Sequence, residues 1–136
     1  MLPSRYRRPT IDLFNDFMDI FDISVSTSGV KTPVYDVIEN EKEYVIEMLL
    51  AGVPKENINI DIDKDVLTIK AERKEVKDVK YNRKETYFGK YERSFVLPEN
   101  ADKEKIEASL VDGILKVIVP KQEEEVKNDK IKIEIK

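Results

Sequence analysis

Carboxylates are the residues of this chain that could most readily do chemistry. Asp61 and Asp63 lie two residues apart, and residues 123–125 are three consecutive glutamates, so either group could be proposed as paired carboxylates for catalysis. Such charge runs more often mark a solvated strand face or a charged tail. We therefore assign no catalytic residue to either group.

The amino-acid composition excludes the other common catalytic and cofactor sites. The chain has no histidine for a triad and no cysteine nucleophile, and its four glycines form no Gly-x-x-x-x-Gly-Lys-Ser/Thr phosphate loop. Without histidine and cysteine, zinc would have only carboxylate ligands, and no disulfide can form. We expect no enzymatic activity, no metal, no cofactor and no small-molecule substrate.

Charge and hydropathy limit the expected partners and location. The formal net charge is −4, and the one basic cluster, at Arg5, Arg7 and Arg8, is expected to be a solvated tail, so we expect no nucleic-acid partner. The sequence shows no secretion signal, and no apolar run approaches the roughly 20 residues that span a bilayer. The expected location is the cytoplasm, with no membrane partner.

The elements that must position any functional residue fall into three zones of different composition. Residues 1–31 form an N-terminal arm, residues 32–120 a body with strand-like alternation, and residues 121–136 a charged tail. Pro33 and Pro120 mark the two boundaries. A chain of 136 residues has room for one domain of about 100 residues with short extensions.

The arm carries a helical pattern over residues 11–21, with Thr10 as a possible N-terminal cap. At 100° per residue, one arc contains five polar residues and the other seven apolar ones. The polar arc is Asp12, Asn15, Asp16, Asp19 and Asp22, and the apolar arc is Ile11, Leu13, Phe14, Phe17, Met18, Ile20 and Phe21. The four aspartates argue against docking on anionic lipid. Permanent packing of the apolar arc on the chain's own domain is the alternative.

From residue 34 onward the apolar residues recur with a period of two, which predicts an antiparallel β-sandwich. Strands are expected over residues 34–38, 44–50 and 90–97. A hairpin turning at residues 64–65 would set three apolar pairs on one face: Ile58 with Ala71, Ile60 with Ile69, and Ile62 with Leu67. The polar residues 73–90 are too long for a simple hairpin connection, so we expect an excursion with its own short strand.

Asp112-Gly113 is the strongest hairpin signal, because a type I′ turn needs positive φ at both central residues. The expected pairs are Leu110 with Leu115, Ala108 with Val117, and Ile106 with Val119. The tail ends in Ile131, Ile133 and Ile135, separated by charged residues. Three isoleucines on one face of a terminal strand need a groove.

Three segments of the body resemble motifs of the α-crystallin domain, the defining module of the small heat-shock proteins. Leu50-Ala51-Gly52-Val53 resembles the family's Leu-Pro-Gly-Val turn, with alanine in place of proline. Residues 89–98 resemble the strand that carries the family's arginine, here Arg93, and residues 108–115 match the pattern Ala-x-x-x-Asn/Asp-Gly-Val-Leu with isoleucine for valine. With a phenylalanine-rich arm and a terminal Ile-x-Ile, the resemblance covers the whole chain.

The resemblance implies an all-β, immunoglobulin-like antiparallel sandwich with a short helical N-terminal arm and an extended C-terminal tail. It also implies an ATP-independent holdase that binds unfolding client proteins and works as a dynamic homo-oligomer built from dimers. The runner-up is a monomeric co-chaperone module of the same sandwich type, against which the terminal Ile-x-Ile and the long excursion argue.

Site residues follow from the same resemblance, together with the unplaced apolar surface of the arm. The expected client contacts are Phe14, Phe17, Met18, Ile20 and Phe21. The expected oligomer motif is Ile131, Ile133 and Ile135, in either of two overlapping registers, and its receiving groove is Ile58, Ile60, Ile62, Ile106 and Ala108. Folding of the tail onto its own domain is the alternative. The expected dimer interface contains Arg93, Glu85 and Tyr87, with Glu85 or Glu92 among the candidates to pair with Arg93.

Overall fold

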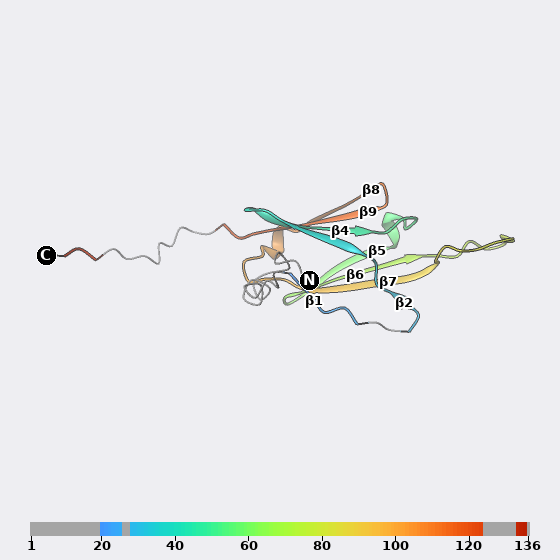
Figure 1. The fold of residues 1–136 in the computed structure, drawn as a ribbon, viewed down its shortest axis with the longest axis horizontal. Helices are drawn as coiled ribbons and strands as arrows, with labels where there is room; N and C mark the ends of the chain where they lie inside the picture. Colours follow the sequence, from blue (N-terminus) through green and yellow to red (C-terminus); the bar gives the residue numbers. More distant parts are fainter. Residues whose placement is uncertain (1–19, 26–27, 124–132, 136) are drawn as a thin grey trace, which may run out of the picture.

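The computed structural model describes residues 20–25, 28–123 and 133–135 and shows two β-sheets packed face to face (Figure 1). The first sheet has the order β1-β7-β6-β5, with β2 also paired to β7. Its strands are β1 Phe21–Asp22, β2 Val30–Lys31, β5 Ile58–Asp63, β6 Val66–Arg73 and β7 Gly89–Val96. The second sheet has the order β3-β4-β9-β8. Its strands are β3 Tyr35–Glu39, β4 Glu43–Leu49, β8 Glu107–Val111 and β9 Ile114–Pro120. All described pairings except that of β2 are antiparallel, which confirms the all-β prediction.

The core lies between the sheets and is made by alternate residues of the central strands, as the period of two predicts. The side chains that are almost completely buried are Ile46 and Met48 of β4, Leu50 after it, Leu67 and Ile69 of β6, Phe95 of β7, and Val117 and Val119 of β9. Two 3-10 helices, η1 Lys55–Asn57 and η2 Lys103–Lys105, connect strands at the surface. No helix in the described ranges is long and apolar enough to cross a membrane.

Both predicted hairpins form in the predicted register. In the β5–β6 hairpin Ile58 faces Ala71, Ile60 faces Ile69, and Ile62 faces Leu67. In the β8–β9 hairpin Leu110 faces Leu115 and Ala108 faces Val117. Asp112 and Gly113 have φ values of 54° and 76°, as a type I′ turn requires. The expected pair of Ile106 with Val119 is absent, because η2 extends to Lys105 and the ladder begins only at Glu107.

The N-terminal segment differs from the expected helix where the structure describes it. Phe21 and Asp22 form β1, which pairs with Val96 and Phe95 of β7, whereas residues 11–19 lie outside the described ranges. Pairing of this segment with the edge of β7 overrides the helical spacing. Segments 20–25 and 28–31, assigned to the arm from the sequence, therefore lie along the sandwich, and we call them the strap.

The excursion between β6 and β7 extends beyond the ends of both strands as two long limbs that run side by side, yellow-green in Figure 1. The expected short strand is not formed there, since residues 74–88 have no strand pairing in the protomer. A strand needs a neighbour for its backbone groups, and this segment extends past the sheet edges that could supply one. Its two limbs are joined by an ion pair between Lys84 and Glu75 at 2.6 Å and by Arg73 stacking on Phe88 at 4.0 Å.

Candidate functional site

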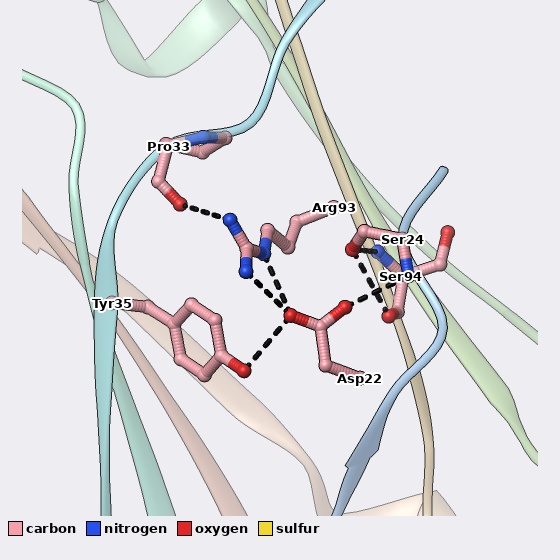
Figure 2. Close-up of polar contacts among 6 residues, drawn as sticks. All are labelled: Asp22, Ser24, Pro33, Tyr35, Arg93 and Ser94. Atoms are coloured by element: carbon pink, nitrogen blue, oxygen red, sulfur yellow. Dashed lines mark hydrogen bonds and ion pairs between the residues drawn. The ribbon is translucent and has the colours of Figure 1, made fainter. Parts of the chain in front are cut away.

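Arg93 of β7 lies at the centre of a polar cluster at the open edge of the sandwich (Figure 2). Its Nε and Nη2 atoms donate to one carboxylate oxygen of Asp22 in β1, at 2.9 and 2.5 Å. Its Nη1 atom donates to the carbonyl oxygen of Pro33 at 3.1 Å. The hydroxyl of Tyr35 in β3 donates to the same Asp22 oxygen at 2.9 Å. One guanidinium group therefore joins β1, β7 and the entry to β3.

Strand register explains why this arginine points between the sheets. Arg93 lies directly opposite Ile69, which is buried, so both side chains are on the inner face of their sheet. Tyr35 reaches the same place from the other sheet, with its ring edge-on to Phe95 at 4.9 Å and its face 4.6 Å from the Arg93 guanidinium carbon. The cluster thus closes the edge of the sandwich with an ion pair in place of apolar side chains.

Partial burial makes this pair different from the other ion pairs described. The side chains of Arg93 and Asp22 are 20% and 22% exposed, whereas those of Arg83 and Glu85 are 82% and 71% exposed. Exposed pairs contribute little to stability, but removing one partner of a buried pair leaves an uncompensated charge. We therefore expect the removal of either Asp22 or Arg93 to leave the remaining charge unpaired and to destabilise the fold.

Electrostatics favour the ionised form of Asp22. Burial alone would raise the pKa of its carboxyl group, but hydrogen bonds from Ser24, Arg93 and Tyr35 outweigh that effect and lower the pKa from 3.8 to about 2. Burial, together with the adjacent Asp22 carboxylate, raises the pKa of Tyr35 above its usual 10.0. At neutral pH the cluster is a carboxylate, a guanidinium and a neutral phenol.

The strap is attached to β7 on either side of this cluster. The Ile23 amide donates to the Ser94 carbonyl at 3.0 Å, and the Ser94 amide donates to the Ser24 hydroxyl at 3.0 Å. At the other end, β2 pairs in parallel with Lys90 and Tyr91. The strap therefore covers most of the β7 edge.

The expected carboxylate partners of Arg93 are not its partners in the protomer. Glu85 pairs with Arg83 at 2.8 Å, and neither Glu85 nor Glu92 forms an ion pair with Arg93 among the described contacts. Asp22 was missed because the helical pattern placed it on a solvated face. A signal for the strand was present, since residues 21–25 read Phe-Asp-Ile-Ser-Val and alternate with a period of two.

The remaining predicted interface residue, Tyr87, lies at the base of the excursion. Its hydroxyl donates to the Lys90 carbonyl at 2.8 Å, its ring packs edge-on to Tyr91 at 5.1 Å, and Lys31 lies 4.4 Å from its centroid. Tyr87 therefore links the excursion, β7 and the strap within one protomer.

The predicted groove residues lie on two edge strands that end their sheets on the same side of the sandwich. Ile58 and Ile60 of β5, together with Ile106 just before β8, are half-buried and pack against the core, whereas Ile62 and Ala108 are more exposed. The outermost strand of a sheet has unpaired backbone N–H and C=O groups along its free edge, and these can pair with another chain. The two edges could therefore accept an extended apolar segment.

The apolar residues predicted to contact clients or neighbouring subunits differ in how far their side chains are exposed. Ile20 packs against the core, whereas Phe21 is 57% exposed, Ile133 83% and Ile135 98%. Phe14, Phe17, Met18 and Ile131 lie outside the described residues. Within the described part of the chain, no cluster of three or more acidic residues is placed to hold a metal ion.

Comparison with known proteins identifies the family. Residues 36–136 match the model of the Hsp20/alpha crystallin family. Small heat shock protein C4 of Rickettsia felis is 42% identical over 129 residues, which cover 90% of this chain and 78% of that protein. A 17.6 kDa class I heat shock protein of Solanum peruvianum is 39% identical over 130 residues, covering 90% and 83% of the two chains.

Solved structures agree with that assignment. Heat shock protein 16.0 from Schizosaccharomyces pombe superimposes with a TM-score of 0.68 at 28% identity, covering 97% of each chain. A small heat-shock protein from Xylella fastidiosa, described as having a distinct high order structure, gives a TM-score of 0.64 at 30% identity, covering 77% of this chain and 96% of that one. The chain therefore belongs to the Hsp20/alpha crystallin family, the small heat-shock proteins, whose members are generally ATP-independent chaperones that form oligomers.

Proposed function

We propose that this protein is an ATP-independent holdase that binds unfolding cytoplasmic proteins during heat stress and prevents their aggregation. The observation that carries the proposal is the exposure of large apolar side chains outside the closed core, namely Phe21 at 57%, Ile133 at 83% and Ile135 at 98%. Apolar surface of this kind is favourably buried against another protein. The Hsp20/alpha crystallin family match supplies the class of activity.

Clients would bind first to the aromatic and aliphatic residues of the arm. The proposed contacts are Phe14, Phe17, Met18, Ile20 and Phe21. Each such side chain gains about 1.5 to 3 kcal/mol on full burial, so a few of them together can retain an unfolded segment. Ile20 packs against the core in the closed protomer and would contribute only after the strap has moved.

Assembly would use the tail and the two edge strands opposite the strap. Ile131 and Ile133, or Ile133 and Ile135, would enter a neighbouring subunit between β5 and β8, where Ile58, Ile60, Ile62, Ile106 and Ala108 form the receiving apolar surface. Main-chain pairing with an edge strand would supply affinity, and the alternate isoleucines would supply register.

Dimers would form through the excursion and β3. The β3 strand ends its sheet, and nearby Val34, Val37 and Ile38 are 64%, 39% and 48% exposed. A strand in the excursion of one subunit would pair with β3 of its partner, which would bring Glu85 and Tyr87 to the interface beside Arg93. The missing strand neighbour of the excursion would then be supplied by the second copy.

Light scattering of a heat-labile enzyme, heated with and without this protein and in the absence of nucleotide, tests the holdase. We expect scattering to fall in proportion to added protein and the purified protein to have a mass far above one chain. A monomer that leaves scattering unchanged would contradict the proposal and favour the co-chaperone module.

A further inference from the structure

The strap is held on β7 by very little regular structure. Each of β1 and β2 has two residues, and they approach the same edge in opposite directions, β1 antiparallel and β2 parallel. So short a ladder is marginal by itself, because few backbone hydrogen bonds offset the entropy of ordering the segment. Side-chain contacts must therefore decide whether the strap stays closed.

The charge-assisted contacts of the strap converge on Asp22, whereas the Ser24 hydroxyl accepts a bond from the Ser94 amide and Lys31 lies over the Tyr87 ring. Its carboxylate accepts bonds from the Ser24 amide at 2.8 Å, the Tyr35 hydroxyl at 2.9 Å, and Nε and Nη2 of Arg93 at 2.9 and 2.5 Å. Figure 2 shows that these donors come from the strap, β3 and β7. Because the pair is mostly buried, losing one partner leaves the other charge buried without a counter-charge. The contacts should therefore form and break together.

Opening the strap would expose two surfaces at once. Ile20, which packs against the core, would become available beside the arm that precedes it in the sequence. The edge of β7, now paired with Phe21, Asp22, Val30 and Lys31, would offer unpaired backbone groups to an extended chain. The strap itself demonstrates what that edge accepts, namely an extended segment whose carboxylate, from a residue opposite Phe95, accepts hydrogen bonds from Arg93.

We propose that the Asp22–Arg93 pair is a latch that keeps the strap closed on β7 and withholds Ile20 and the β7 edge from unfolding clients. This regulation rests on the proposed holdase function. Heating opens the latch because the conformational entropy released by the strap gains weight with temperature. The extended segment that then takes the β7 edge is one from the unfolding client.

Hydrogen exchange of the Ile23 and Ser94 amides in the full chain reports strap opening without any client. Asp22→Asn removes the charge at nearly constant shape, and we expect exchange at Ile23 to accelerate on the order of tenfold, as for loss of one charge-assisted bond. Asp102→Asn is the matched control, since Asp102 pairs with Lys105 and is 24% exposed, close to the 22% of Asp22. Equal exchange in the two variants would overturn the latch.

A disulfide tests the link between opening and client capture. Phe21 of β1 and Val96 of β7 are direct cross-strand partners. Because the chain has no cysteine, the double variant Phe21→Cys with Val96→Cys can form only one intramolecular disulfide. The reduced and oxidised forms share one sequence and so have lost Phe21 equally. We expect the oxidised, locked form to suppress client aggregation several-fold less than the reduced form at the same temperature. Equal suppression by the two forms would overturn the proposal.

Failure of the holdase itself would give a different result. Wild type and both forms of the cysteine variant would then leave client aggregation unchanged, while Asp22→Asn would still accelerate exchange at Ile23. That combination would overturn the withholding of clients together with the holdase, whereas suppression by wild type with no effect of the lock would overturn only the regulation.

Discussion

At neutral pH the Asp22 carboxylate contributes to folding because its pKa is about 2 in the folded chain, against 3.8 without these contacts. A group with a lowered pKa in the folded state stabilises fully above its unfolded value, and the contribution is lost as pH falls through the folded value. We expect wild type to exceed Asp22→Asn by about 1 to 2 kcal/mol in free energy of unfolding at neutral pH, with most of the difference lost by about pH 2. Urea unfolding of both proteins across this range measures it.

Other carboxylates titrate over the same range, but they are common to both proteins. The difference between wild type and Asp22→Asn therefore isolates the contribution of this one group. A difference that stays constant from neutral pH to about pH 2 would contradict the lowered pKa of Asp22.

Gly113 is a second residue whose replacement has a predictable cost in free energy of unfolding. It adopts φ +76° in the turn between β8 and β9, and a Cβ atom there would lie 3.2 Å from Cα of Ala51. We expect Gly113→Ala to cost about 1 to 2 kcal/mol in urea unfolding, from the positive φ and the contact together. Gly29→Ala is the control, because Gly29 has φ +82° with nothing within 4 Å of a Cβ atom. Equal costs for both variants would show that the Ala51 contact is unimportant.

Among the elements, the two hairpins could be predicted in register because their information is local. A turn dipeptide flanked by alternating apolar residues determines which side chains face each other, and β5–β6 and β8–β9 obey it. The order of strands in the sheets, and the placement of Arg93 between them, depend on contacts between distant residues such as Arg93 with Asp22. No local pattern contains that information.

The strap shows where local reasoning fails at this scale. Apolar residues at 11, 14, 17, 18 and 21 fit a helix, yet Phe21 and Asp22 are extended because β7 offers them an edge. The excursion is the opposite case, since the strand expected there does not form within the protomer, where no neighbouring strand is available, and its pairing with a second copy stays a prediction. In both elements the presence or absence of a partner strand decides the outcome, and for residues 21–25 it selects the period-two pattern over the helical one.

The tail permits a test of assembly and of register together. Replacing Ile131, Ile133 and Ile135 by alanine should reduce the assembly towards dimers, because the apolar anchors of the proposed groove contact are lost. Lys132→Ala with Glu134→Ala is the control, which leaves the isoleucines in place. Light scattering coupled to size-exclusion chromatography measures the mass.

Single variants then distinguish the two registers. If the pair used is Ile131 with Ile133, Ile131→Ala should reduce the mass and Ile135→Ala should not, and the reverse is expected for the other register. An unchanged mass in the triple variant would contradict tail exchange altogether.

At the scale of the whole molecule, the strap changes how the arm should be removed. Deleting residues 1–19 leaves Asp22 and the β1 pairing in place, so the sandwich should keep its thermal stability while client suppression falls. Deleting residues 1–31 also removes the partner of Arg93, and we expect a lower melting temperature because a mostly buried guanidinium loses its carboxylate. Calorimetry and client light scattering measure the two effects.

These truncations separate stability from activity. Full suppression after deletion of residues 1–19 would remove the client-binding role from Phe14, Phe17 and Met18. Equal melting temperatures for the two truncations would contradict the structural importance of the Asp22–Arg93 pair.

Closure of the β7 edge also bears on the protein's own solubility. Of the strands that the structure describes, β6 and β7 are the longest, with eight residues each, and an uncovered β7 edge would be a long template for ordered addition of further strands. A two-residue antiparallel strand followed by a parallel one cannot be continued as a regular sheet, so the strap blocks fibril growth where it would be easiest. We therefore expect the closed strap to protect this protein from stacking on copies of itself into amyloid.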